Sequence, residues 1–214
     1  MVTDCIEPAE IDFFQRLQSF LSSRGVRIPR KIRKICGVDA AYSSDTNHVI
    51  AVATLFMDGH LEKTSIYTGR FTFPYVSGLF FLHEGPFAVA AVRKLEETPQ
   101  LVCFDAHGLA HPRLKGLATV CGMVLGIPSI GIAKSVLVGK ASSYRSGLQK
   151  IVFDGRCVGY ITSETRKRYW SPGYSMSLKT LEGVIRQYGT VCMNALEEAH
   201  KLAKESISNY GKSQ

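Results

Sequence analysis

The chain has 214 residues, of which 45% are hydrophobic and 21% are charged, so it carries enough apolar material for a sizeable core. This composition excludes an intrinsically disordered chain and a collagen-like repeat. Its 26 basic and 18 acidic residues give a net charge of +8 and a pI near 9.2. A basic surface of this kind favours an anionic partner, with nucleic acid first among them.

Three further features bear on the compartment. The six cysteines are scattered without a C-x-x-C pair, so we interpret them as small buried side chains in a reducing compartment. Asp4, Glu7 and Glu10 precede any apolar stretch, which does not resemble a signal peptide. The uncharged stretch 117–133 is broken by three glycines and a proline, so it predicts helix, turn and buried strand instead of a membrane span. We therefore expect a soluble, cytoplasmic protein.

The chain opens with a predicted helix followed by a basic segment, together about residues 7–34. The helix is predicted to pack through an apolar face at i, i+1, i+4, i+7 and i+8, which is formed by Phe13, Phe14, Leu17, Phe20 and Leu21. The segment 24–34 then carries six basic residues and no acid. Two interpretations remain open for this segment, a solvated connection or a patch that contacts phosphates.

The core, about residues 35–205, alternates strands and helices. Strands are predicted at 35–42, 49–57 and 61–73, with a hairpin turn at Asp58-Gly59, and are followed by a helix at 84–97, a strand at 101–105, a helix near 113–125 and a strand near 129–132. A hairpin at 151–153 and 157–161 turns at Asp154-Gly155, and two helices end the chain, one after the N-cap candidate Ser177 and one at about 194–207. No repeat or linker divides residues 1–214, so we predict a single domain.

This order of elements predicts an α/β fold with a mixed sheet, in which three antiparallel strands adjoin parallel strands and helices flank the faces. It is the element order of the ribonuclease H-like fold, although many α/β proteins share parts of it.

Three acids lie at the ends of predicted elements or interrupt an apolar one. Asp39 interrupts the apolar strand at 35–42, Asp105 ends the strand at 101–105, and Glu84 opens a helix. A carboxylate in an apolar strand is costly unless it is paired, hydrogen-bonded or bound to a metal ion. Oxygen ligands from separate elements are what Mg²⁺ or Mn²⁺ requires, so the three acids together predict a divalent metal site. Each acid alone could equally be a cap or turn residue.

The segment after Asp105 gathers polar residues in a strand-to-helix loop, where α/β sheets bind ligands. This His-Gly segment contains His107, Gly108, His111 and Arg113 in the string D-A-H-G-L-A-H-P-R. This string, together with G-V-D-A-A-Y at 37–42, F-P-Y-V-S-G at 73–78, H-E at 83–84 and G-I-A-K-S at 131–135, resembles the endonuclease V family in order and spacing. The resemblance extends over about residues 35–205, and the nine-residue string is its most specific part.

The resemblance implies a ribonuclease H-like fold and a metal-dependent endodeoxyribonuclease of DNA repair. Its substrate would be DNA containing deoxyinosine, with inosine-containing RNA as the alternative. Cleavage in this family falls at the second phosphodiester bond 3′ of the lesion and leaves 3′-hydroxyl and 5′-phosphate ends. Mg²⁺ is the expected cofactor, Mn²⁺ is expected to substitute for it, and we expect a monomer.

The resemblance also implies roles for individual residues. Asp39, Glu84 and Asp105 would be metal ligands by motif, and His200 would be a further ligand by its register in the last helix. Lys134 would lie close to the scissile phosphate. Taken locally, His200 could be a surface histidine, and Lys134 could be a lysine whose stem lies along the surface.

The family's wedge is Pro-Tyr-Ile-Pro, and residues 74–77 read Pro-Tyr-Val-Ser here, so the resemblance implies that the ring of Tyr75 would fill the gap left by an extruded base. The residues implied in nucleic-acid and lesion binding are Pro74, Tyr75, Val76, Ser77, Gly78, Phe80, Ala106, His107, Gly108, His111 and Arg113. Three positions depart from the family pattern: Ser77 replaces a proline, Ala106 replaces a glycine, and His83 stands where arginine is common. None of the three alters the carboxylates, so activity is expected, whereas wedge rigidity and base preference stay open.

Two other functions fit parts of the sequence. A non-catalytic inosine-binding protein would keep the pocket and the basic surface, but binding alone needs no acids facing a phosphate. Another ribonuclease H-like nuclease, such as a resolvase or an inosine-RNA nuclease, would share the carboxylates. A resolvase would have no use for Pro74-Tyr75 or for the His-Gly segment.

Overall fold

The computed structural model describes residues 6–21, 27–43, 47–71, 73–142, 148–163 and 166–210. Within these ranges the chain forms a nine-stranded sheet with the order β3-β2-β1-β4-β5-β9-β8-β7-β6. The strands are β1 (Lys34–Ser43), β2 (His48–Met57), β3 (His60–Arg70), β4 (Leu101–Phe104), β5 (Ser129–Ala133), β6 (Lys140–Ala141), β7 (Gln149–Phe153), β8 (Arg156–Thr162) and β9 (Arg168–Pro172). Strand β4 pairs in parallel with β1 and β5, and the other described pairs are antiparallel.

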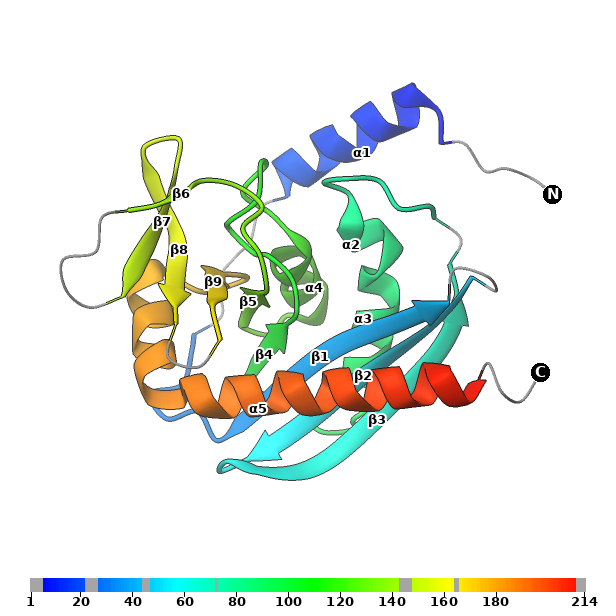
Figure 1. The fold of residues 1–214 in the computed structure, drawn as a ribbon, viewed down its shortest axis with the longest axis vertical. Helices are drawn as coiled ribbons and strands as arrows, with labels where there is room; N and C mark the ends of the chain where they lie inside the picture. The colour runs from blue at the N-terminus through cyan, green and yellow to red at the C-terminus, as the bar shows by residue number, and fades with distance from the viewer. Residues whose placement is uncertain are drawn as a thin grey trace.

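Helices cover both faces of this sheet (Figure 1). They are α1 (Pro8–Phe20), α2 (Phe80–His83), α3 (Gly85–Arg93), α4 (Leu117–Leu125) and α5 (Leu178–Tyr210). One apolar cluster joins α3 and α4 to β1, β2 and β4, and a second joins α5 to β1, β4, β5, β8 and β9. The predicted mixed sheet flanked by helices is confirmed, as are the hairpin turns at Asp58-Gly59 and Asp154-Gly155.

The prediction of two terminal helices is wrong, because α5 is one helix of 33 residues. Figure 1 shows its axis bending in the orange part, near its beginning. Ser177 precedes the helix as predicted, and its Oγ accepts a hydrogen bond from the Thr180 N–H at 3.0 Å. The buried side of the helix continues without a break on both sides of the expected boundary at 194, through Leu181, Val184, Cys192, Ala195, Leu196, Ala199 and Ala203. The sequence prediction also missed α2, β6 and β9, and placed the start of α4 too early.

The predicted packing face of α1 is wrong for three of its five residues, while Phe14 and Leu21 are partly buried. Phe13, Leu17 and Phe20 are 61%, 48% and 82% exposed, whereas the buried residue of the described helix is Gln18, at 1%. Gln18 is buried because its side-chain amide is hydrogen-bonded to the segment 113–115. Polar contacts of Gln18 thus help to hold the helix, and hydrophobic periodicity does not detect them.

Cysteine burial follows the sequence prediction where it is described. Cys36, Cys103, Cys121 and Cys192 are buried free thiols, Cys157 is partly buried, and Cys5 lies outside the described residues. Burial raises the pKa of the Cys36 and Cys121 thiols, which keeps them unreactive. Among the described helices, none is both long and apolar enough to cross a membrane.

Candidate metal and nucleic-acid site

The parallel pairing of β1 with β4 brings the two predicted aspartates together. Val38 lies beside Phe104 in this ladder, and the Asp105 N–H donates to the Val38 carbonyl at 3.3 Å. Asp39 therefore extends from the middle of β1 next to Asp105, the first residue after β4. An acid that interrupts one strand and an acid that ends the neighbouring strand meet at a single point.

Close packing of α5 on β1 brings His200 to the same point. A Cβ on Gly37 would lie 2.3 Å from the carbonyl carbon of Ala195, so only glycine allows the helix this near to the strand. The Thr54 hydroxyl fixes the contact by donating to the Ala195 carbonyl at 2.8 Å. His200 then places Nδ1 2.5 Å from Oδ2 of Asp39.

The ligand atoms of Asp39, Asp105 and His200 all lie within 4.8 Å of one another, and this group, the acidic cluster, could hold a metal ion. Glu84 lies outside that set of three, at the junction of α2 and α3, and is buried. Its carboxyl is nevertheless near enough to Asp39 and Asp105 to interact with both electrostatically. The structure therefore groups three of the four predicted ligands and places the fourth beside them.

Burial and repulsion by neighbouring carboxylates raise the pKa of Glu84 and of Asp39. The pKa of Glu84 is raised well above its usual value, first by burial and then by Asp39 and Asp105. The pKa of Asp39 is raised by burial and by Asp105, against the opposing effects of His200 and Lys134. A cation among the three carboxylates would relieve this repulsion and favour their ionised forms.

Lys134 lies directly after β5 and its Nζ forms an ion pair with Asp105. Its side chain is 52% exposed, so the ammonium group is accessible to a substrate. The alternative of a lysine bound only along the surface does not describe this position, because the ammonium group contacts a residue of the acidic cluster.

A cavity of about 540 Å³ opens beside the cluster and shares Asp105 with it. The predicted site residues that line it are Tyr75, Ser77, Gly78, Phe80, Asp105, Ala106, His107, His111 and Lys134. Pro74, Val76, Gly108 and Arg113 are not among its lining residues. Sequence reasoning missed other lining residues, among them Gln18, Tyr42 and Ser135. A glutamine between apolar helical positions was the available signal for Gln18.

Two exposed aromatic residues line this cavity, Tyr75 with 64% of its surface accessible and Tyr42 with 53%. Tyr75 is the one that the sequence predicted. Its ring meets Phe80 and His83 edge-on, with centroid distances of 5.9 and 6.2 Å. His83 is buried, stacks on Phe71 at 3.6 Å and bonds the Phe73 carbonyl through Nδ1. His83, which stands where arginine is common in the family, thus packs against the beginning of the segment that carries Tyr75.

Two residues of the His-Gly segment contact protein where ligand contact was expected. A Cβ on Gly108 would lie 2.1 Å from the Pro172 carbonyl oxygen, so its missing side chain makes room for β9. The Arg113 guanidinium donates to Gln18 and to the Gly78 carbonyl. The role of lesion contact therefore remains a prediction for both residues, and the described structure uses them for packing and positioning.

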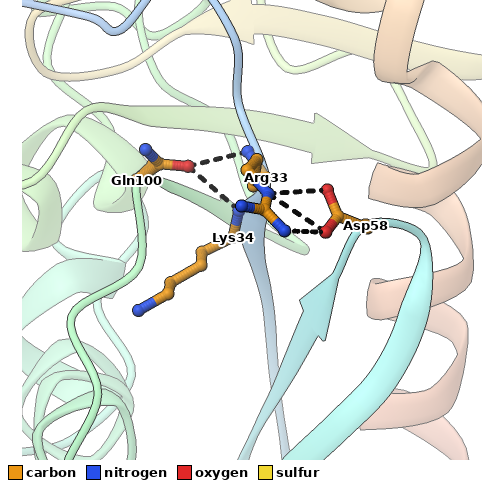
Figure 2. A network of polar contacts seen from close by, with 4 residues as sticks. All are labelled: Arg33, Lys34, Asp58 and Gln100. Carbon is orange, nitrogen blue, oxygen red and sulfur yellow. Dashed lines mark hydrogen bonds and ion pairs between the residues drawn. The ribbon is translucent and has the colours of Figure 1, made fainter.

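The basic segment is described from Arg27 onward, and Arg24 lies outside the described residues. Figure 2 shows its last two residues in a polar network. Arg33 pairs with Asp58 through two nitrogens, and the backbone N–H groups of Arg33 and Lys34 donate to Oε1 of Gln100 at 2.7 and 3.1 Å. Lys34 also pairs with Glu97 at 3.1 Å. These contacts favour a structural connection for this end of the segment.

The mixed sheet flanked by helices is the ribonuclease H-like fold of solved endonuclease V structures, and its acidic cluster is compatible with a metal site. A family model described as Endonuclease V matches residues 17–195. An endonuclease V of Saccharolobus islandicus (strain Y.N.15.51 / Yellowstone #2) is 34% identical over 178 residues, covering 81% of this chain and 86% of that protein. The chain belongs to the endonuclease V family, whose members are DNA-cleaving nucleases and hydrolases.

Solved structures show the same fold. The endonuclease V of Bacillus subtilis has a TM-score of 0.82 at 22% identity, with 99% of this chain and 96% of that chain covered. An endonuclease V of Ciona intestinalis, in complex with a 24mer DNA containing an inosine followed by a ribo-adenosine, has a TM-score of 0.77 at 17% identity. That comparison covers 94% of this chain and 98% of the Ciona chain. The predicted family, ribonuclease H-like fold and nuclease class are confirmed.

His111 predicts a pH dependence of stability. Burial, with Arg113 and His107 nearby, lowers its pKa from 6.5 to about 4. The unfolded chain therefore binds more protons between these values, and stability is lost as pH falls from about 6.5 to 4. We expect His111→Asn to reduce this pH-dependent loss in the free energy of unfolding by at most about 3 kcal/mol. Urea unfolding from pH 4 to 7 measures it. The exposed His60→Asn is the control, and a difference between wild type and His111→Asn that does not vary with pH would contradict the assignment.

The ion pairs of the basic segment predict a salt-dependence experiment. Arg33→Gln should leave the slope of log K against log salt for DNA binding unchanged, because Arg33 already pairs with Asp58. Arg30→Gln is the matched change at an exposed residue for which the described part of the chain shows no ion pair. A lost phosphate contact lowers the slope by about 0.9 on duplex DNA. A smaller slope for Arg33→Gln alone would contradict the structural interpretation.

Proposed function

We propose that this chain hydrolyses the second phosphodiester bond 3′ of a deaminated purine, chiefly deoxyinosine in DNA, and leaves 3′-hydroxyl and 5′-phosphate ends. Inosine-containing RNA is the alternative substrate. We further propose that it acts as a monomer in the cytoplasm, that residues 1–214 form one domain, and that Mg²⁺ is its cofactor, with Mn²⁺ able to substitute.

One observation carries the proposal: the cavity and the acidic cluster meet at Asp105. An extruded base needs a pocket with aromatic or apolar walls and a few polar groups, and Phe80 and His107 supply both kinds of lining. His107 lines the cavity, so its ring could contact a base held there. A base in the cavity would put its 3′ phosphates near Asp105 and Lys134.

The donor set fits a hard divalent ion, because the cluster offers two carboxylates and an imidazole with a third carboxylate alongside. Asp39, Asp105 and His200 would hold the ion, and Glu84 would complete the ligands directly or through water. A bound Mg²⁺ supplies Lewis-acid polarisation of the phosphate and of the attacking water. Lys134 would place its positive charge beside the phosphate, where it now pairs with Asp105.

The decisive experiment compares oligonucleotides that contain inosine, uracil, an abasic site or no lesion, each as DNA and as RNA. We expect cleavage of inosine substrates only, dependent on Mg²⁺ or Mn²⁺ and abolished by EDTA. Sequencing of the products should place the cut at the second bond 3′ of the lesion. Cleavage that persists in EDTA, or preferential cutting of undamaged junctions, would rule the proposal out.

Asp105→Ala should lower turnover by more than about 100-fold while the fold is retained. The change removes a ligand and also removes repulsion against Asp39 and Glu84, so the melting temperature should not fall. The exposed Asp12→Ala on α1 removes the same charge and serves as the control. Turnover of Asp105→Ala within about tenfold of wild type at saturating Mg²⁺ would show that the ligand set is misassigned.

Tyr75→Ala should weaken binding of inosine duplexes by about five- to 150-fold, the value of one base–aromatic stack. Single-strand cleavage should suffer less, because an unpaired base costs less to extrude. Tyr75→Phe should be nearly silent, since the described structure shows no hydrogen bond from the Tyr75 hydroxyl. Single-turnover cleavage of matched single- and double-stranded oligonucleotides measures both variants. Equal losses on the two substrates would contradict the wedge assignment.

A further inference from the structure

The buried amide of Gln18 ties α1 to the loop that follows His111. Its Nε2 donates to the Lys115 carbonyl at 2.5 Å, and its Oε1 accepts from Nε of Arg113. Lys115 returns the connection, with Nζ donating to the Ser19 carbonyl at 3.0 Å. Because a buried amide is costly without partners, these bonds fix both the end of α1 and the orientation of the guanidinium.

The other side of the same guanidinium reaches the turn that follows Tyr75. Nη2 of Arg113 donates to the Gly78 carbonyl at 2.5 Å. Gly78 has φ +79°, and the turn is closed by the Leu79 N–H donating to the Val76 carbonyl at 2.9 Å. A Cβ on Gly78 would lie 2.5 Å from Nη2, so the guanidinium packs directly against this turn.

Two more contacts connect the same parts of the chain. The ring of His111 lies near the Gly78 backbone, and its Nδ1 accepts from the Arg113 N–H at 3.2 Å. Phe14 of α1 meets Phe73 edge-on at 5.6 Å, just before Pro74-Tyr75. The segment that carries Tyr75 is therefore held on one side by Phe73 and on the other by Gly78, and α1 contributes to both contacts.

We propose that Gln18 and Arg113 are positioning residues for base extrusion. Gln18 orients the guanidinium of Arg113, the guanidinium holds the Gly78 turn, and the turn presents Tyr75 at the edge of the cavity. This inference rests on the proposed function for the role of Tyr75. It makes α1 part of the lesion-recognition site through Gln18, although α1 lies far from the acidic residues in the sequence.

Hydrogen exchange of the substrate-free protein tests the connection without any catalysis. Gln18→Leu removes both side-chain bonds of Gln18 at similar size, and should speed exchange of the amides at 75–79 by about five- to 30-fold. Gln15→Leu is the matched control on the same helix, since the described structure shows no hydrogen bond from its side chain. Amides of β1 and β4 should keep their exchange rates in both variants.

Gln18→Glu separates the two bonds of Gln18, because it keeps an acceptor for the guanidinium but loses the donor to the Lys115 carbonyl. If the bond to Arg113 holds the turn, the amides at 75–79 should exchange more slowly in this variant than in Gln18→Leu. If Gln18→Leu also speeds exchange in β1 and β4, Arg113→Lys decides, because a lysine keeps the charge but cannot span both partners as a planar fork. Faster exchange at 75–79 alone in Arg113→Lys would support the proposal.

Cleavage gives the second readout. Gln18→Leu should lose more activity on inosine duplexes than on single strands, with the concentration of Mg²⁺ at half-maximal rate unchanged. The proposal is overturned if exchange at 75–79 is unaffected by Gln18→Leu, or is affected equally by Gln15→Leu. A wild type that fails to cut inosine DNA would instead refute the proposed function, while the exchange data would still report on the contact.

Discussion

The contact between α5 and β1 at Gly37 is the constraint on which the site depends. Strand and helix meet backbone to backbone there, because a Cβ on Gly37 would overlap the Ala195 carbonyl group. The buried alanines Ala199 and Ala203 extend the contact to β2 by keeping side chains small along the same face. With the helix axis this close, a histidine five residues after Ala195 reaches a carboxylate in the middle of the strand. A bulkier residue at Gly37 would separate His200 from Asp39 without touching either.

The site gathered by this packing is electrostatically unfavourable without a cation. Three carboxyl groups repel one another in a partly buried position, and the pKa values of Asp39 and Glu84 rise as a result. Lys134 and His200 offset part of the repulsion through their contacts with Asp105 and Asp39. A site that is only partly compensated in this way favours a divalent ion, because the ion both neutralises the carboxylates and gains several oxygen ligands. The same acids that reduce stability are thus the ones that favour metal binding.

Much of the fold and of the acidic site could be predicted because their signals are local. Alternating strands, the turns at Asp58-Gly59 and Asp154-Gly155, and acids at strand ends all follow from short stretches of sequence. The failures involve contacts between distant segments. Hydrophobic periodicity predicted a buried face on α1, but Gln18 holds the helix through partners 97 and 95 residues away. The short strand β9 lies beside β5 in the sheet, far from it in the sequence. Its residues show no alternation of buried and exposed side chains that would have revealed the strand.

The Ser77 departure and the Arg113 contact bear on the same turn. Residues 76–79 have the pattern of a type II turn, with a positive φ at its third residue, Gly78, and a normal φ at Ser77. Proline is favoured at the second position of this turn because its ring presets φ, and the family's wedge places a proline there. Ser77 leaves the turn with greater conformational freedom in the absence of other restraints. The bond from Arg113 to Gly78 supplies such a restraint from outside the segment, so the turn is held in part by α1 and the His-Gly segment through Gln18 and Arg113.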